Sequence, residues 1–202
     1  MLTVTPVLFA VWALAGFYAS LGPALVRSLA DSHSIVLGGL SLFVLAGSAA
    51  LSVVVLRGAA ARTLMLTGIL ALVLGVASTL VAVAAGSTVG FFAGTVIAGI
   101  GFGSGFQGGI RTVLPLVAPH ERAGVLSLLY VVSYLGLGVP AIAAGYLVVH
   151  SGGLVVTARE YGIAVIALAT MALIAVLRRR EPAAPAARAP RAETSTCTLQ
   201  VR

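Results

Sequence analysis

Long apolar runs, broken at short intervals by arginines and turn residues, make up most of this chain. Each of six runs is about long enough for a helix that crosses the hydrocarbon core of a bilayer, which takes roughly 20 residues. The runs cover about Val4–Val26, Ile35–Leu56, Thr63–Ala85, Val89–Val117, Ala123–Val149 and Tyr161–Leu177. The pattern therefore predicts an all-α integral membrane protein with a six-span domain over residues 1–177.

The segments between these runs are too short to hold an extramembrane domain. They are Ser28–Ser34, Arg57–Arg62, Gly86–Thr88, Ala118–Arg122 and His150–Glu160. After the sixth run, residues 178–202 are rich in Ala, Pro, Arg and Thr and show no apolar period. Such a composition cannot bury enough apolar surface to fold, so we expect a disordered cytoplasmic tail there.

The composition points to lipid rather than water as the main surroundings. The chain is 60% hydrophobic and 8% charged, with a formal net charge of +7, whereas an average soluble domain is about 25% charged. The basic residues flank apolar runs or lie in the tail, and they form no basic patch on a polar domain. We therefore expect the lipid bilayer as a partner and no nucleic acid.

The distribution of arginines predicts an orientation. With the N-terminus in the cytoplasm, nine arginines fall in cytoplasmic segments: Arg57, Arg62, Arg122, Arg178, Arg179, Arg180, Arg188, Arg191 and Arg202. Arg27 and Arg159 fall on the other side, and Arg111 lies within the fourth run. Because cytoplasmic loops carry an excess of basic residues, we expect a multi-pass protein of the plasma membrane with both termini cytoplasmic.

The first span begins almost at the first residue. Met1–Pro6 carries no basic residue, although positive charge on the cytoplasmic side usually sets the direction of a first span. We expect such a start if a longer chain precedes Met1.

A glycine-rich stretch distinguishes the fourth run. Gly99 and Gly103, Gly101 and Gly105, and Gly105 and Gly109 are each four residues apart. This repeated GxxxG spacing lets helices approach closely and gain dispersion contacts that lipid does not provide. The glycines therefore indicate either a tightly packed structural helix or a helix that bends or rocks, and both can hold together.

Two polar residues follow on the same run. Arg111 within a membrane segment costs at least about 2.5 kcal/mol on insertion scales unless it reaches the interface or pairs. It is either an interfacial anchor or a cavity-facing cation. Gln107 lies four residues earlier and shares its helix face, so we predict that this face lines a cavity.

Three further residues stand out because of their place within a span. Pro23 removes a helix hydrogen bond and predicts a kink at the end of the first span. Tyr18 lies well inside that span, so its hydroxyl needs a partner, either in ordinary helix packing or on a substrate. Pro140 lies among small residues of the fifth run, which indicates a packed kink or a gating element.

The sequence offers little to an enzyme. His33, His120 and His150 all fall in predicted loops, and Cys197 stands alone in the tail. No motif for a metal, a cofactor or a catalytic nucleophile is present. We therefore expect no enzyme activity, no cofactor and no metal.

Four stretches of the chain resemble the C-terminal six-helix half of a major facilitator superfamily transporter. The stretch from Gly99 to Arg111 resembles the family's glycine-rich helix ten, and Pro119–Gly124 resembles the short loop after it. Arg57–Arg62 is similar to a reduced form of the basic loop between helices eight and nine. Gly136–Gly145 weakly resembles the antiporter motif of helix five, the symmetry mate of this span.

The resemblance implies a fold and a function. A full member has twelve helices in two halves, each of two inverted three-helix repeats, with substrate near the midplane between the halves. The first and fourth spans here would line the cavity, which makes Trp12, Tyr18, Gln107 and Arg111 candidate lining residues. The implied function is alternating-access transport of a small, partly apolar molecule, with efflux as the expected direction. The partner would be a second six-helix half, in the same longer chain, in a separate chain or in a homodimer.

Two other functions stay open at this point. The chain could be a non-transporting truncated or accessory membrane protein that packs through its GxxxG faces. An intramembrane enzyme is a further alternative, for which Tyr18, Gln107 and Arg111 are the remaining candidate residues.

Overall fold

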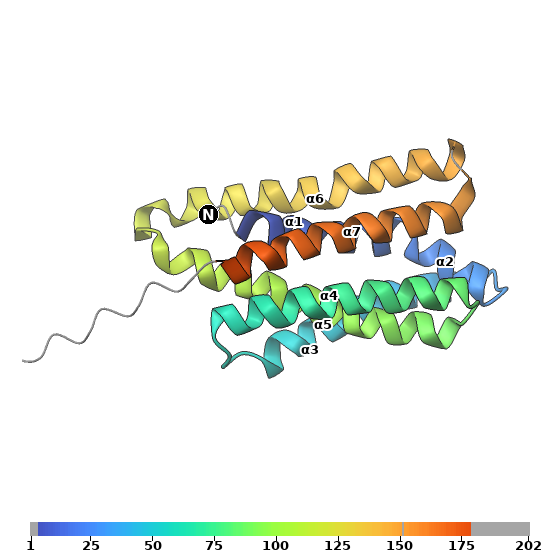
Figure 1. Ribbon diagram of the computed structural model, residues 1–202, viewed down its shortest axis with the longest axis horizontal. Coiled ribbons are helices and arrows are strands. Elements are labelled where there is room, and N and C mark those ends of the chain that lie inside the picture. The colour runs from blue at the N-terminus through green and yellow to red at the C-terminus, as the bar shows by residue number, and fades with distance from the viewer. Residues whose placement is uncertain (1–3, 151, 179–202) are drawn as a thin grey trace, which may run out of the picture.

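The computed structural model describes residues 4–150 and 152–178. Within these ranges the chain folds into helices joined by short turns, and they contain no β-strand. The elements are α1 (Val4–Ser20), α2 (Gly22–Leu29), α3 (Ile35–Val55), α4 (Ala61–Ala84), α5 (Thr88–Val113), the 3-10 turns η1 (Leu114–Leu116) and η2 (Pro119–Glu121), α6 (Arg122–His150) and α7 (Gly153–Arg178). Figure 1 shows them as an elongated bundle.

The expected membrane spans are present as long apolar helices. In the described ranges, five helices are long and apolar enough to cross a membrane, and a sixth span results if the bent pair of α1 and α2 is taken as one. The prediction of an all-α chain is therefore confirmed for this part, and the predicted number of six spans is reached when α1 and α2 count as one span. Several apolar helices of this length indicate a membrane protein.

The first span bends by 50° where α1 ends and α2 begins. Pro23 has no backbone N–H, so the carbonyl of Ala19 loses its partner four residues on. The neighbouring bonds survive, since Leu21 N donates to Phe17 O and Leu25 N donates to Leu21 O, both at 2.9 Å. The predicted kink is therefore present, and the chain stays helical on both sides of it.

The end of the bundle between α6 and α7 differs from the expectation. The predicted linker His150–Glu160 is wrong, because α6 runs to His150 and α7 begins at Gly153. Gly152 and Gly153 turn the chain at φ values of 120° and 86°, which glycine adopts without steric cost. Arg159 and Glu160 consequently lie on the exposed face of α7.

The predicted tail falls almost entirely outside the described residues. Arg178 is the last residue of α7, and the expectation of disorder for the rest stays a prediction.

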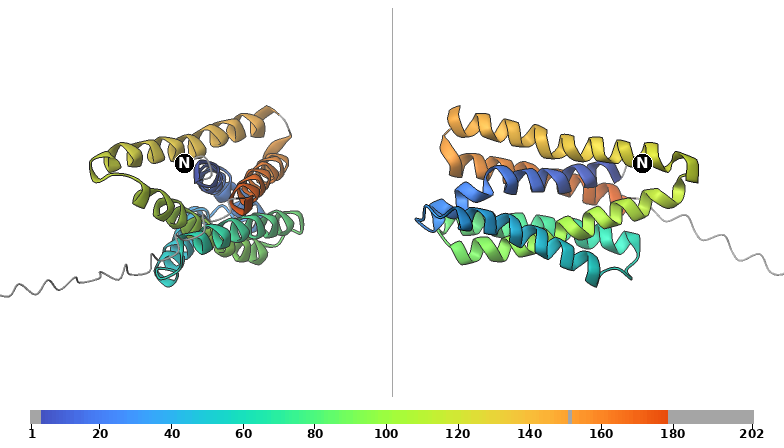
Figure 2. Two further views of the ribbon diagram at one scale, coloured as in Figure 1. Left: turned by 60° about the vertical axis from the view of Figure 1, so that its left-hand side comes forward. Right: turned by 180° about the vertical axis from the view of Figure 1, so that it is seen from behind.

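The helices pack around α1 and α5. The most extensive pairing joins α4 to α5, and α3 packs against the other side of α5. α1 lies among α5, α6 and α7, and α7 also packs on α4. α6 therefore lies along one side of the bundle, separated from α3 and α4 by α1, α7 and α5 (Figures 1 and 2).

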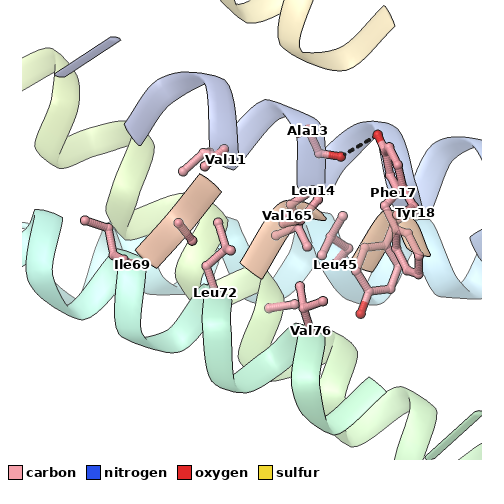
Figure 3. Packing of buried hydrophobic residues seen from close by; sticks show 14 of the residues in the cluster. Val11, Ala13, Leu14, Phe17, Tyr18, Leu45, Ile69, Leu72, Val76 and Val165 are labelled. Atoms are coloured by element: carbon pink, nitrogen blue, oxygen red, sulfur yellow. Dashed lines mark hydrogen bonds between the residues drawn. The ribbon is translucent and has the colours of Figure 1, made fainter. Parts of the chain in front are cut away.

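The core lies between α1 and α4. Leu14, Phe17 and Tyr18 of α1 and Leu72 of α4 are at most 1% exposed. Figure 3 shows these side chains gathered between the helices, with Leu45 of α3 and Val165 of α7 beside them. A dashed line marks the bond that the Tyr161 hydroxyl of α7 donates to the Ala13 carbonyl of α1, at 2.9 Å.

The glycines of α5 make its close packing possible. A Cβ at Gly101 would meet the backbone of Leu72 on α4, and one at Gly103 would meet the Ala49 carbonyl on α3. Gly99 likewise faces Ser48 of α3. Close packing of a structural helix is therefore what these positions show, and rocking of α5 stays a prediction.

Candidate functional site: an aromatic face on α1, α5 and α6

The four candidate lining residues fall into different surroundings. Tyr18 lies in the core, Gln107 and Arg111 lie between α5 and α3, and Trp12 lies where α1, α5 and α6 meet. The structure therefore does not bring the four together into one site, and each is described in turn.

Tyr18 is part of the helix packing. Its side chain is 0% exposed, and its hydroxyl lies 2.8 Å from Thr79 Oγ1 of α4. The Thr79 hydroxyl donates its single proton to the carbonyl of Gly75 at 2.9 Å, so Tyr18 is the donor of the shared bond. The hydroxyl thereby has the partner that a phenol inside a span needs.

Gln107 and Arg111 share one face of α5, as predicted from their spacing, and this face points toward α3. Gln107 Nε2 donates to the carbonyl of Val53 at 3.4 Å, near the last turn of α3. Arg111 Nη1 donates to the carbonyl of Ala59 at 3.3 Å, in the turn after α3. Carbonyls at a helix C-terminus lack intrahelical partners and carry partial negative charge, so Gln107 caps α3. Arg111 instead holds the turn that joins α3 to α4.

One atom of this pair stays without a partner. The Gln107 Oε1 atom is buried and accepts no hydrogen bond from the described residues. The prediction that the Gln107 and Arg111 face lines a cavity is not tested by these contacts, and it stays a prediction.

Trp12 is the centre of a cluster of aromatic rings. Its indole meets Phe102 and Phe106 of α5 edge to face, with centroids 5.6 and 5.7 Å away. Tyr134 of α6 lies tilted at 6.2 Å and stacks at 6.5 Å with Tyr130, one turn earlier on α6. Such ring pairs contribute about 0.5–1.5 kcal/mol each beyond their area burial, so the rings join α1, α5 and α6.

The cluster carries hydrogen-bonding groups without partners. The Trp12 Nε1 atom is buried and donates to no acceptor among the described residues. Tyr130 and Tyr134 are 52% and 66% exposed, and within residues 4–150 and 152–178 neither hydroxyl has a hydrogen bond. A buried donor left without an acceptor costs about 1–3 kcal/mol, so this arrangement calls for a partner.

The exposed tyrosines lie deep in their span. Tyr134 follows the first residue of α6 by about 18 Å at a rise of 1.5 Å per residue, near the middle of a 29-residue helix. This position is far from the interfacial belts in which membrane tyrosines usually place their hydroxyls. We name the surface formed by Trp12, Phe102, Phe106, Tyr130 and Tyr134 the aromatic face.

A shallow groove adjoins the aromatic face, lined by Phe106, Tyr130 and Ser133 among others. A separate cavity of about 210 Å³ lies between α1, α5 and α6, lined by Val4, Thr5, Leu8, Val113, Leu129 and Val132 among others. None of the five aromatic residues lines this cavity, and Leu129 borders both hollows.

The backbones approach closely behind the aromatic face. A Cβ at Gly136 of α6 would lie 3.0 Å from the Phe9 carbonyl and 3.3 Å from the Trp12 Cβ. Pro140, one turn later and half-buried, lines an apolar cavity of about 260 Å³ between α6 and α7. α6 remains one continuous helix through Pro140, and gating there stays a prediction.

Charge and metal chemistry are sparse around the face. The described acids are Asp31, Glu121 and Glu160, and none of them lines the two hollows. In the ranges that the structure describes, no group of His, Cys, Asp and Glu side chains could hold a metal ion. The groups that the described part of the face presents are therefore aromatic rings and the polar N–H and O–H groups of Trp12, Tyr130 and Tyr134.

Sequence reasoning identified Trp12 and did not select Tyr130 or Tyr134. Their spacing of four residues within an apolar run was a readable signal, since it places both on one helix face.

Comparison with protein-family models, with curated proteins and with solved structures finds no match to this chain.

Proposed function

We propose that this chain is the C-terminal half of a twelve-helix secondary transporter. It would move a small, partly apolar molecule across the plasma membrane by alternating access, with efflux as the direction. In this proposal the aromatic face borders the substrate cavity, and a second six-helix half forms the opposite wall. Both termini lie in the cytoplasm.

The exposed tyrosines of α6 carry the proposal. A polar group left unsatisfied in hydrocarbon costs several kcal/mol, and the hydroxyls of Tyr130 and Tyr134 lie at span depth without a partner in the described chain. On α4, by contrast, the exposed large side chains Leu70, Leu74 and Val81 are aliphatic and suit lipid. A water-filled or protein-covered surface at α6 removes this cost.

The pairing of the helices supports the same proposal. If the first three spans and the last three are equivalent, α1 corresponds to α5, α3 to α6 and α4 to α7. The contact of α1 with α6 then corresponds to the contact of α5 with α3. In the same way, the contact of α4 with α5 corresponds to that of α7 with α1, and all four pairs pack in the bundle. Two three-helix repeats of the kind found in transporters would produce such a correspondence. It is partial, because α6 packs on α7 whereas α3 does not pack extensively on α4.

The arginines support the proposed orientation. Arg57 and Arg62 follow α3 and begin α4, Arg122 begins α6 and Arg178 ends α7. In a bundle of alternating spans these four positions share one side. Arg27 near the end of α2 and Arg159 of α7 belong to the other side, so the excess of positive charge lies with the proposed cytoplasmic ends.

Cysteine accessibility in native membranes tests the proposal. In a Cys197→Ser background, Tyr134→Cys is compared with Leu74→Cys, a matched position near the middle of α4 that is 60% exposed. Thiols react as thiolates, which form in water and not in lipid, so we expect an impermeant thiol reagent to label Tyr134→Cys at least about tenfold faster. Equal, slow labelling of both would place Tyr134 in lipid and overturn the proposal.

The mass of the native polypeptide tests whether a second six-helix half belongs to the same chain. An antibody against the residues after 178 should detect a species near twice 20.3 kDa if both halves share one chain. A 20.3 kDa species that forms neither a dimer nor a complex with another membrane protein would contradict the transporter proposal.

The alternative function is a non-transporting accessory protein, and the two experiments above distinguish it from a transporter. It was expected to pack through the GxxxG faces of α5. Those faces are occupied within the chain, because Gly99 and Gly103 face α3 while Gly101 and Gly108 face α4. An accessory protein would therefore need another surface for its partner.

A further inference from the structure

We propose that the aromatic face binds a neutral, planar aromatic molecule that presents a hydrogen-bond acceptor to the indole N–H of Trp12 and to the α6 phenols. This inference rests on the proposed function, because it names the class of substrate for the same cavity wall.

The shape of the face selects a flat ring system. Trp12 stands edge-on to Phe102 and Phe106, with interplanar angles of 73° and 81°, and Tyr130 and Tyr134 lie nearly parallel at 30°. Rings presented both by edge and by face accept another ring in offset or T-shaped contact. The exposed side of Tyr134 gives such a ring access.

The charges near the face disfavour a cation. Aromatic faces attract cations, and organic cations are held by aromatic cages. Here no acid lines either hollow near the face, so a cation would find no counter-charge among the residues that line them. A neutral ligand needs none.

The unpaired groups select an acceptor. The indole Nε1–H is a donor only, and it has no acceptor in the described chain. Because this atom is buried, the proposal requires a neighbouring side chain to move, and it assigns that movement to the exposed Tyr134 ring, 6.2 Å from the indole. The phenols of Tyr130 and Tyr134 add two donors at the entrance.

The indole of Trp12 makes the hydrogen bond directly observable. These 202 residues contain one Trp, and its ¹⁵N-tryptophan indole resonance is identified by its absence from Trp12→Phe. The protein, in nanodiscs and with any co-purifying partner unlabelled, is titrated with three flat tricyclic probes: xanthone, which is neutral and has a carbonyl acceptor, anthracene, which lacks one, and N-methylacridinium, which is a cation.

We expect xanthone to move the indole proton downfield in a saturable way. Anthracene and N-methylacridinium should produce at most shifts proportional to their lipid partitioning. Saturation by N-methylacridinium but not by xanthone would overturn the proposal in favour of a cation site. Equal effects of xanthone and anthracene would show that no acceptor is recognised.

A matched pair of variants localises the binding. Tyr134→Leu removes a ring that touches Trp12, whereas Tyr146→Leu removes an equally exposed ring on the same helix that stacks on His150 instead. We expect about a tenfold weaker xanthone affinity for Tyr134→Leu, since one lost interaction of about 1.4 kcal/mol has that effect. Unchanged affinity for Tyr134→Leu, or equal loss in both variants, would contradict the site.

The two proposals fail separately. If Tyr134→Cys reacts from water but xanthone leaves the indole resonance in place, the cavity stands and the ligand class is wrong. If xanthone binds while Tyr134→Cys stays inert in native membranes, the chain has an aromatic binding site without the transport pathway.

Discussion

The hydroxyls of Tyr18 on α1 and Thr79 on α4 lie 2.8 Å apart, although 61 residues separate them in the chain. Both side chains are 0% exposed. The bond therefore joins the bent first span to the closely packed α4–α5 pair in the middle of the core.

A double-mutant cycle measures this bond. Tyr18→Phe removes the donor, and Thr79→Val removes the acceptor together with the Thr79 bond to Gly75. Hydrogen bonds between membrane helices contribute about 0.6 kcal/mol on average, so we expect a coupling free energy of that order. It is read from the free energies of unfolding in mixed micelles. A coupling indistinguishable from zero would mean that the two hydroxyls do not interact.

The second prediction concerns the packing of α5 on α3. Gly103→Ala places a Cβ against the Ala49 carbonyl and the Ser52 hydroxyl of α3. Overpacking of this kind costs about 1–3 kcal/mol, and the temperature of thermal unfolding in detergent should fall accordingly.

Gly138→Ala is the matched control for the packing prediction. Gly138 also lies within a long helix, and a Cβ there has nothing within 4 Å. Its unfolding temperature should stay constant or rise, because alanine favours the helix over glycine by up to about 1 kcal/mol. A similar loss in both variants would point to general helix disruption instead of the α3 contact.

The third prediction concerns the Arg111 contact with the turn between α3 and α4. Arg111→Leu removes the donor to the Ala59 carbonyl. A hydrogen bond contributes about 0.5–1.5 kcal/mol net to stability, so we expect a small drop in thermal stability. Arg111→Lys, which keeps the charge, should lose less.

Arg159→Leu is the control for this variant, since Arg159 is exposed on α7. We expect its thermal stability to be close to that of the unchanged protein. If Arg111→Leu is as stable as the control but abolishes ligand binding, Arg111 acts on a ligand and not on the turn between α3 and α4.

The helices themselves were largely predictable from the chain. Apolar runs long enough to cross a bilayer predict the positions of the helices. Pro23 predicts the bend of the first span, because proline has no backbone N–H to donate to the preceding turn. Arg57 and Arg62 predict the turn between α3 and α4, because a charged side chain is costly inside the hydrocarbon.

The start of α7 was missed because two signals compete there. Arg159 and Glu160 read as a water-facing linker, whereas Gly152 and Gly153 mark the true turn through their positive φ. Charged residues are compatible with the first turns of a long span that reaches past the hydrocarbon, so the glycine pair was the better signal.

The candidate site was less predictable than the helices. A spacing of four placed Gln107 and Arg111 on one face, but it does not say which helix that face meets, and it meets α3. Tyr18 was expected to need a partner, and nothing in its neighbourhood along the chain identifies Thr79. Contacts between distant spans depend on how the helices cross, which one sequence does not specify.

The largely exposed surface of α6 has a dynamic consequence. Within its 29 residues, Ser133, Gly136 and Ala144 are buried, fewer than in α4 or α5, although α6 packs extensively on α1. Regions with few buried contacts open first in hydrogen exchange, at a free energy below that of global unfolding. The amides of α6 on the side away from α1 should thus exchange with deuterium before those of α4 and α5.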